Sequence, residues 1–239
     1  MKKWNCVITC YNYAHYVEKA VKSVLNQKHD SIVITIVNDC SKDNSYEICE
    51  EIRQKHPEVN VIHNEQNMGV SYSRNIGVAY EKTSYVLILD ADDEIGSDFL
   101  KISEEHFSSG YDIVIPKIFI KNHDMHQYFW FNPSEDGPIT YSSICSRNPL
   151  PVTSPYRYEL WQKVNGYKTR SLYEDHDFWM SVFWHDPKVV QSEMVFYLTY
   201  HPNSRCRSVD YKEGRVEKRK LLEFHKEEMK KYFGFKIFY

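Results

Sequence analysis

The N-terminal part of the chain, up to residue 90, alternates between short apolar runs and segments with helical periodicity. Residues 32–37 read Ile-Val-Ile-Thr-Ile-Val, a β-branched run typical of a strand buried on both faces of a parallel sheet. Residues 17–25 place apolar side chains three and four positions apart, which predicts an amphipathic helix. Because parallel strands need a crossover between them, the alternation predicts a doubly wound α/β sheet. We expect further strands at residues 6–9, 59–62 and 85–89, a helix between the turn at 41–45 and Pro57 with Ile48, Cys49 and Ile52 inward, and a helix over residues 71–80.

The C-terminal half of the chain is less regular. Residues 121–155 show no sustained period, and such long irregular segments in compact domains are commonly functional. We therefore predict one domain at residues 1–211, followed by a C-terminal helical extension at 212–239 with an aromatic tail. The expected elements of this half are strands at 111–120 and 189–200 and helices at 155–164, 174–185 and 212–232.

Composition excludes several classes of protein. Hydrophobic residues make up 42% and charged residues 26% of the chain, as in packed globular proteins. The net charge of -3 argues against nucleic acid as the main partner. The N-terminus lacks the apolar run of a signal peptide, and no stretch approaches the roughly 20 apolar residues of a membrane span. The six cysteines form no CxxC pair, so we expect reduced, buried thiols in a cytoplasmic protein.

Polar side chains follow three of the predicted strands. Thr9 and Tyr11 come after the first strand, Asp39 follows the second, and the acidic run Asp-Ala-Asp-Asp at residues 90–93 follows the fourth. Because ligands of open α/β sheets bind beyond the C-terminal ends of the strands, we expect these residues to share one site. Neither GxGxxG nor GxxxxGK[ST] is present, which excludes a dinucleotide fingerprint and a P-loop.

The acidic run at residues 90–93 predicts a divalent metal site. Mn²⁺ and Mg²⁺ are held by one or two protein carboxylates together with phosphate oxygens of the substrate. A cation between the carboxylates and a phosphate group also removes the repulsion between them. The alternative is a chance cluster of acids or a solvated helix N-terminus.

Five short stretches stand in the order and at the separations of a known family. They are VITCYN at residues 7–12, VNDCSKD at 37–43, NMGVSYSRN at 67–75, LDADD at 89–93 and EDHDFW at 174–179. Together they resemble a family 2 glycosyltransferase with the GT-A fold, across roughly residues 4–205. The resemblance implies an inverting, nucleotide-sugar-dependent enzyme. It also implies a Rossmann-like nucleotide-diphospho-sugar transferase fold, with a mostly parallel central sheet flanked by helices.

The resemblance implies roles for single residues in binding the donor and the metal. Tyr11 would stack on the nucleobase and Asp39 would hydrogen-bond it, most often a uracil. Arg74 would lie near the base or the diphosphate. Asp90 would face the ribose or the metal, and Asp92 would bind the metal, Mn²⁺ or Mg²⁺.

The sequence also departs from the family pattern. Thr9, which we expect at the nucleotide-sugar site, stands where many members carry proline, and Cys10 stands where threonine or serine is common. Asn38 replaces the first of two usual acids and leaves Asp39 as the second. The identity of the base is therefore left open, with a UDP-sugar as the expected donor.

The resemblance places the general base at Asp175. This carboxylate would accept the proton of an acceptor hydroxyl as its oxygen attacks the anomeric carbon, while the metal stabilises the departing diphosphate. We expect a glycan or a lipid-linked sugar as the acceptor, selected by residues 121–155. Asp177 is a competing base.

Four further groups of residues are expected to contact the acceptor, the diphosphate or the metal. Glu174 adjoins the base, and Trp179 lies one helical turn after it as a sugar platform. His201 follows the last strand as a further metal ligand, and Arg205 or Arg207 would close over the diphosphate. Structural alternatives stay open: an ordinary tyrosine at Tyr11, a cap of the Ser41 turn at Asp39, favourable helix N-terminal charge at Glu174 and Asp175, core packing of Trp179, a structural His201, and surface charge at Arg205 and Arg207.

Two other functions compete with transfer. One is a catalytically inactive GT-A binding module, against which the intact Asp90, Asp92 and Asp175 argue. The other is a sugar nucleotidyltransferase, against which the missing Gly-rich loop after the first strand argues. The aromatic tail at residues 233–239 predicts a peripheral membrane contact or a homodimer contact.

Overall fold

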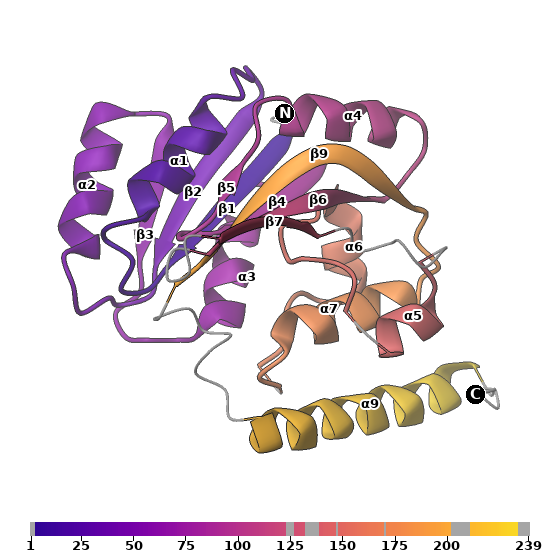
Figure 1. Cartoon of the computed structure of the whole chain (residues 1–239). Helices are drawn as coiled ribbons and strands as arrows, with labels where there is room; N and C mark the ends of the chain where they lie inside the picture. The colour runs from indigo at the N-terminus through magenta and orange to yellow at the C-terminus, as the bar shows by residue number, and fades with distance from the viewer. Residues whose placement is uncertain are drawn as a thin grey trace.

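A central sheet with helices on both faces forms the molecule (Figure 1). The structure is a computed structural model, and it describes residues 3–122, 127–131, 139–146, 148–169, 171–201 and 211–233. This arrangement confirms the predicted α/β class.

The strands of the sheet stand in an order that differs from their order along the chain. The strands are β1 (Trp4–Cys10), β2 (Ile32–Asn38), β3 (Val59–His63), β4 (Tyr85–Asp90), β5 (Glu94–Ile95), β6 (Ile113–Asn122), β7 (Gln127–Phe131), β8 (Tyr156–Arg157) and β9 (Val189–Tyr200). They stand in the order β3-β2-β1-β4-β8-β6-β9-β5, and β7 pairs with β6. β1 to β4 form a parallel block, and β6 and β9 are also parallel. β5, β7 and β8 pair antiparallel, so the sheet is mixed, and the predicted parallel order holds for the two blocks only.

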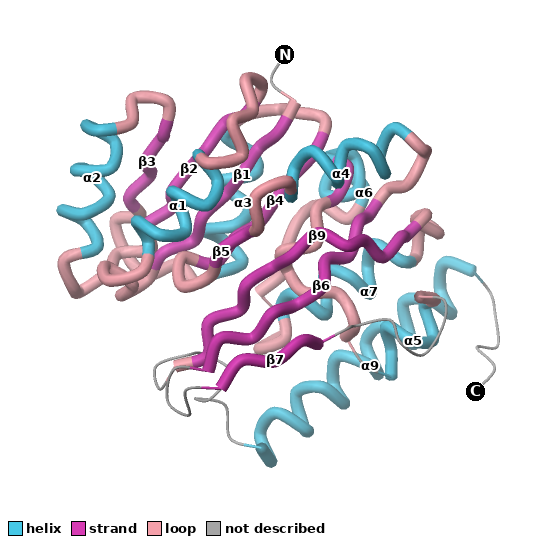
Figure 2. Tube along the Cα trace, turned by 45° about the horizontal axis from the view of Figure 1, so that its top comes forward, coloured by secondary structure: helices cyan, strands magenta, loops and turns pink. Residues whose placement is uncertain are grey.

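Helices cover both faces of the sheet. They are α1 (Val17–Leu25), α2 (Ser45–Lys55), α3 (Val70–Tyr80), α4 (Phe99–Ser108), α5 (Tyr141–Ser146), α6 (Tyr158–Lys163), α7 (Glu174–Phe183) and α9 (Tyr211–Phe233). In Figure 1, α1, α2 and α4 lie on one side of the sheet, and α3, α6 and α7 lie on the other. Figure 2 shows the same layers from a tilted view, with α9 beyond the sheet.

Alternate residues of β1 feed two separate hydrophobic cores. Cys6 and Ile8 belong to the core beneath α1, α2 and α4, whereas Val7 belongs to the core beneath α3, α6 and α7. All three side chains are fully buried, as expected for a strand covered on both faces. The second core also contains Leu221 of α9, so the C-terminal helix packs on this side of the domain.

Gly77 allows α3 to lie directly on the sheet. A Cβ atom at this position would stand 2.3 Å from Val7 Cγ1 and 3.2 Å from Val37 Cγ2. Any larger side chain would push the helix outward. This close approach sets the height of α3, and with it the height of Arg74 one turn earlier, above the strand ends.

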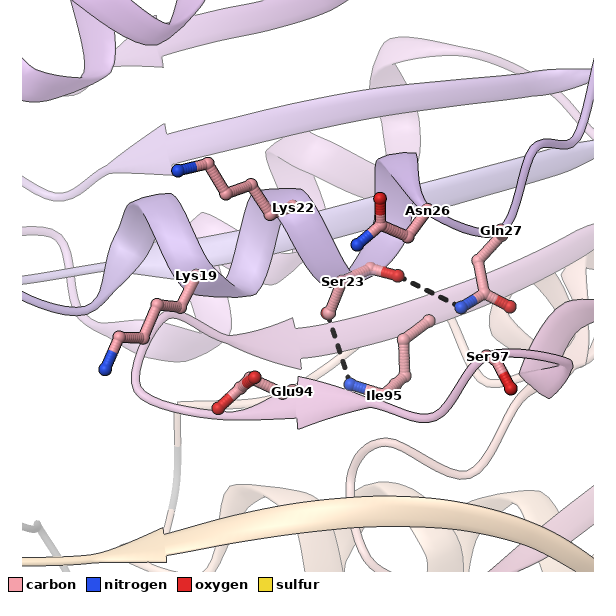
Figure 3. Close-up of a pocket in the computed structure, with 8 residues that line it drawn as sticks. All are labelled: Lys19, Lys22, Ser23, Asn26, Gln27, Glu94, Ile95 and Ser97. Carbon is pink, nitrogen blue, oxygen red and sulfur yellow. Dashed lines mark hydrogen bonds between the residues drawn. The ribbon is translucent and has the colours of Figure 1, made fainter.

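Ser23 of α1 and Gln27, two residues beyond that helix, anchor the chain that follows the acidic run; the bond between Ser23 and Ile95 is drawn in the close-up of a surface pocket (Figure 3). The Ile95 backbone N–H donates to Ser23 Oγ at 3.2 Å, and Gln27 Nε2 donates to the Gly96 carbonyl at 2.7 Å. The Leu100 N–H donates in turn to Gln27 Oε1 at 3.2 Å. The short strand β5 is thereby held against β9, whose C-terminal end leads to His201.

The predicted elements up to residue 90 are confirmed, with ends that agree within three residues. Helices α4 and α5 and strand β7 were not predicted, and the last two lie inside the segment at 121–155 that showed no period. Helix α6 begins at Tyr158 instead of residue 155, because Tyr156 and Arg157 form strand β8. No helix in the described part of the chain is long and apolar enough to cross a membrane.

Candidate functional site

Thr9 and Asp90 meet at the C-terminal ends of two neighbouring parallel strands. The register of β1 and β4 places the two residues opposite each other. Thr9 Oγ1 donates a hydrogen bond of 2.8 Å to Asp90 Oδ1. The Asp90 side chain keeps 32% of its surface exposed, so this carboxylate is both oriented by the protein and open to a ligand.

Arg74 links the strand ends to helix α7. Nη1 donates to Glu174 Oε1 at 3.0 Å, and Nη2 donates to Asp90 Oδ1 at 3.2 Å. The guanidinium carbon lies 5.5 Å from the centre of the Tyr167 ring, and the side chain is 3% exposed. Burial by itself would lower the pKa of Arg74, but the carboxylates of Asp90 and Glu174 outweigh it, and the pKa is raised. Arg74 is therefore a fixed cation.

Asp39 holds the turn that leads into α3. Its Oδ1 accepts from the Met68 N–H at 2.8 Å and from Asn64 Nδ2 at 2.7 Å, and its Oδ2 accepts from the Gly69 N–H at 2.8 Å. Gly69 has a φ of +83°, which favours glycine at this turn. Asp39 is only 4% exposed, so its carboxylate has a structural role, and contact with a base stays a prediction.

The Ser41 turn is capped by Asn38 instead of Asp39. Asn38 Oδ1 accepts from Ser41 Oγ at 2.5 Å and from the Ser41 N–H at 3.3 Å. Ser41 Oγ accepts in turn from the Asn12 N–H at 2.9 Å. The departure from the family pattern at Asn38 thus fixes the turn after Tyr11, which is 39% exposed beyond the end of β1.

Asp92 and His201 form a buried pair from distant parts of the chain. His201 Nε2 lies 3.2 Å from Asp92 Oδ2, and the side chains are 3% and 11% exposed respectively. The imidazole stacks on the Tyr16 ring, with centres 4.9 Å apart, and meets the edge of the Tyr13 ring. Burial, and next the charge of Asp90, raise the pKa of Asp92 to about 6.

The Asp92–His201 pair fits a divalent metal that also binds substrate. Two neighbouring ligands in an octahedral Mg²⁺ sphere, each at roughly 2.1 Å from the metal, lie about 3.0 Å apart. The measured 3.2 Å between Asp92 Oδ2 and His201 Nε2 is close to that separation. The described residues contain no cluster of three or more His, Cys, Asp or Glu side chains that could hold a metal. A metal here would therefore need ligands from a phosphate-bearing substrate or water.

Asp93 has a structural role, although it belongs to the same acidic run. Its Oδ1 accepts a hydrogen bond of 2.8 Å from the Thr199 N–H, and its side chain is 4% exposed. Burial raises the pKa of Asp93 well above its ordinary value. This contact fastens the acidic run to β9 two residues before His201.

Asp175 lies in the first turn of α7, next to Glu174. Its Oδ2 accepts a hydrogen bond of 2.9 Å from Asn148 Nδ2. Burial raises the pKa of Asp175, whereas the nearby Arg74 charge opposes the rise. A partly buried carboxylate with a raised pKa is a stronger base than an exposed one, which is the property a general base needs.

Two residues of α7 that the sequence offered for the site lie in the core. Asp177, the competing base, is fully buried and lies 2.7 Å from His225 Nε2 of α9, away from any open surface. Trp179, the expected sugar platform, is also fully buried, with its ring against Tyr156 and Phe178. Both point into the core, because their positions on the helix face the sheet and α9 rather than the strand ends.

Some predicted site residues lie outside the described residues, and the sequence analysis did not identify two residues that contact the site. Arg205, Arg207 and the tail beyond Phe233 lie outside the described part of the chain. Sequence reasoning missed Asn64 and Asn148. Asn64 directly follows the third strand, at a strand end that was not considered, and for Asn148 the sequence holds no comparable signal.

The chain matches one family model over most of its length. Residues 6–176 match the model described as glycosyl transferase family 2. Among curated relatives, glycosyltransferase GlyG of Streptococcus pneumoniae is 27% identical over 131 residues, which are 54% of this chain and 44% of GlyG. The minor teichoic acid biosynthesis protein GgaB of Bacillus subtilis is 35% identical over 122 residues, which are 48% of this chain and 13% of GgaB. The chain thus spans less than half the length of these relatives.

Solved structures show the same fold. S. aureus TarS 1–349 in complex with UDP-GlcNAc superposes with a TM-score of 0.72 at 19% identity, covering 96% of this chain and 73% of TarS 1–349. The mannosyltransferase PcManGT from Pyrobaculum calidifontis, in complex with GDP-Man and Mn²⁺, superposes with a TM-score of 0.68 at 13% identity. That match covers 96% of this chain and 64% of PcManGT.

Proposed function

Because the chain belongs to glycosyltransferase family 2 and has a GT-A-like fold, we propose that it moves a sugar from a UDP-sugar to a hydroxyl group of a glycan or lipid-linked acceptor. The chain is a glycosyltransferase by family, and the choice of donor, metal and acceptor is our proposal. The observation that carries it is the Arg74 network, which joins the open carboxylate of Asp90 to the helix that bears Asp175.

The donor would lie across the C-terminal ends of β1, β2 and β4. Tyr11, exposed beyond β1, would stack on the base, and Asp90 would face the ribose, in an orientation that Thr9 fixes. Arg74 would provide positive charge near the diphosphate. UDP is favoured because TarS, which has the same fold, was solved with UDP-GlcNAc, although PcManGT was solved with GDP-Man.

Asp92 and His201 would hold the metal, with Asp90 close by. Mn²⁺ or Mg²⁺ supplies a Lewis acid that neutralises the charge developing on the diphosphate leaving group. The protein side of the reaction is to present a carboxylate and an imidazole at a fixed separation. β5 and Asp93 maintain that separation by fastening the acidic run to β9.

Asp175 would act as the general base of an inverting, single displacement. The acceptor oxygen forms a bond to the anomeric carbon, the bond from that carbon to the diphosphate breaks, and the acceptor proton moves to the Asp175 carboxylate. Glu174 would not compete for the proton, because it accepts the Arg74 hydrogen bond and is buried.

The acceptor would be a glycan or a lipid-linked sugar, of the kind that builds cell-envelope polymers. This part of the proposal is supported by the name of GgaB, a minor teichoic acid biosynthesis protein. The segment that contains α5 would select the acceptor, because α5 packs against α7 and Asn148 lies next to Asp175.

Donor turnover by the purified protein tests the function. We expect release of UDP from UDP-GlcNAc or another UDP-sugar in the presence of Mn²⁺, and faster release with a suitable acceptor. Asp175→Asn should lower kcat by about 10²–10⁴-fold. Asp92→Ala should abolish the stimulation of turnover by Mn²⁺. Asp98→Ala, which removes an exposed carboxylate just before α4, serves as a control. Turnover that is equal in wild type and Asp175→Asn, or absent with every donor, would contradict the proposal.

A further inference from the structure

Asn148 contacts the proposed base from a segment for which the sequence predicted no structure. Its Nδ2 donates a hydrogen bond of 2.9 Å to Asp175 Oδ2. The two residues that follow it, Pro149 and Leu150, are buried, so the backbone at Asn148 is anchored in the core. A second contact joins the same regions, since His176 Nε2 lies 2.6 Å from the Ile144 carbonyl oxygen of α5. The position of Asn148 relative to the first turn of α7 is therefore fixed by two independent contacts.

The orientation of the Asn148 amide is set by the charge of Asp175. If the amide were turned over, its Oδ1 would face Asp175 Oδ2 at hydrogen-bond distance, and two acceptors would repel each other. In the observed orientation Oδ1 is buried and has no hydrogen-bond partner among the described residues. An unpaired buried acceptor is unfavourable, so the N–H bond to Asp175 has to outweigh it. Hydrogen bonds to an ionised carboxylate are strong enough to do so.

We propose that Asn148 is a positioning residue for the transfer reaction, which holds Asp175 ionised and fixes the orientation of its carboxyl group. The proposal rests on the role of Asp175 in the proposed function. A donor on Oδ2 stabilises the ionised carboxylate, in addition to the backbone N–H groups of His176 and Asp175 that also bind it. Asn148 also fixes the rotation of the carboxyl group about the side-chain bond, and thereby the direction in which Oδ1 points.

Asn148 carries no charge, unlike Arg74, Asp90 and Glu174; the neutral Tyr167 ring and the backbone N–H of His176 also lie near Asp175. Arg74 from α3 favours the ionised form of Asp175, whereas Asp90 from β4 opposes it. Glu174 on the same helix is engaged by Arg74. Changing Arg74 or Asp90 would alter donor binding and basicity together, whereas changing Asn148 alters the basicity of Asp175 without changing the charge of the donor site.

A titration of Asp175 tests this without any substrate. Its carboxyl carbon is followed by NMR and assigned from the signal that disappears in Asp175→Asn. In Asn148→Ala we expect the pKa of Asp175 to rise by about one unit, because the ionised form loses a hydrogen-bond donor. In Asn148→Asp, which keeps the shape of the side chain, two carboxyl groups share the site and the rise is larger. Ser146→Ala, which removes an exposed hydroxyl at the end of α5, is the control and leaves the pKa unchanged.

Activity provides the second readout. In the hydrolysis of UDP-GlcNAc with Mn²⁺, the acid limb of the pH profile of kcat should move upward in Asn148→Ala by the same amount as the NMR titration, with the KM for UDP-GlcNAc unchanged. An unchanged pKa of Asp175, or a kcat lowered equally at every pH, would overturn the positioning role. If Asn148→Ala fails to fold, Asn148→Asp decides by the same criteria. A wild type that turns over no donor contradicts the proposed function, and the NMR titration still judges the Asn148–Asp175 contact.

Discussion

Removing His225 should destabilise the whole domain, although this residue belongs to the C-terminal helix. His225 Nε2 lies 2.7 Å from Asp177 Oδ1, and both side chains are fully buried. The imidazole also packs against Trp184, with ring centres 5.0 Å apart. His225→Ala takes away a partner of a buried carboxylate and leaves a cavity beneath α9.

The magnitude follows from the burial of both partners. Breaking a buried pair by removing one side costs roughly 3–5 kcal/mol, because the remaining charged group stays in a medium of low polarity. For a domain of this size each 1 kcal/mol lowers the Tm by about 2–4 °C, so a loss of about 3 kcal/mol predicts a fall of about 6–12 °C. The fall in Tm caused by His225→Ala should be smaller in an Asp177→Asn background, because no charged carboxylate is then left in the core.

Differential scanning calorimetry of four proteins measures this effect: wild type, His225→Ala, Asp177→Asn and the double variant. Arg219→Ala is the matched control on the same helix, because Arg219 is 82% exposed and pairs with Glu223 on the surface. Exposed pairs contribute about 0–1 kcal/mol, so its Tm should hardly change. A Tm for His225→Ala as high as that of Arg219→Ala would refute the argument. The expected fall would instead support α9 as part of the domain.

Three further predictions concern the site and the sheet. The affinity for Mn²⁺ should fall as the pH drops below about 6, because the pKa of Asp92 is raised to about 6 and a protonated carboxyl group is a poor metal ligand. Isothermal titration calorimetry measures this affinity, and a value that is constant from pH 7 to pH 5 would contradict the prediction. Arg74→Lys should raise the KM for the donor and lower the free energy of unfolding by about 2–4 kcal/mol, because one ammonium group cannot span the carboxylates of Asp90 and Glu174 that the guanidinium bridges. Donor kinetics measure the first effect and urea unfolding measures the second. Gly77→Ala should lower stability by about 1–3 kcal/mol in urea unfolding, because its Cβ would stand 2.3 Å from Val7 Cγ1, and an unchanged midpoint would mean that α3 moves freely.

The sequence predicted the parallel block and its strand ends well. The β-branched run of β2 and the apolar stripe of α1 are local patterns, and local patterns decide which face of a strand or helix is buried. Because parallel strands end on the same edge, Thr9 and Asp90 had to come together, and a hydrogen bond of 2.8 Å joins them. The motifs around them were also sufficient to identify the family.

The segment with β7 and α5 was unpredictable because its structure depends on distant partners. β7 exists only by pairing with β6, and α5 is held to α7 by the contact between Ile144 and His176. Neither leaves a periodic pattern in the sequence. The roles of single residues within one motif could not be predicted either, since Asp175, Asp177 and Trp179 lie close together in the chain but face different surroundings.

The sequence by itself determined the family, the alternation of parallel strands with helices and the set of acids at the strand ends, because these depend on short-range patterns and on the direction of the strands. The tertiary structure decided the surroundings of each acidic side chain. It placed Arg74 against Glu174, a hundred positions away, Asp92 against His201, and Asn148 against Asp175. The basicity of a carboxylate depends on burial and on such neighbours, so it is settled only when the packed chain brings them together.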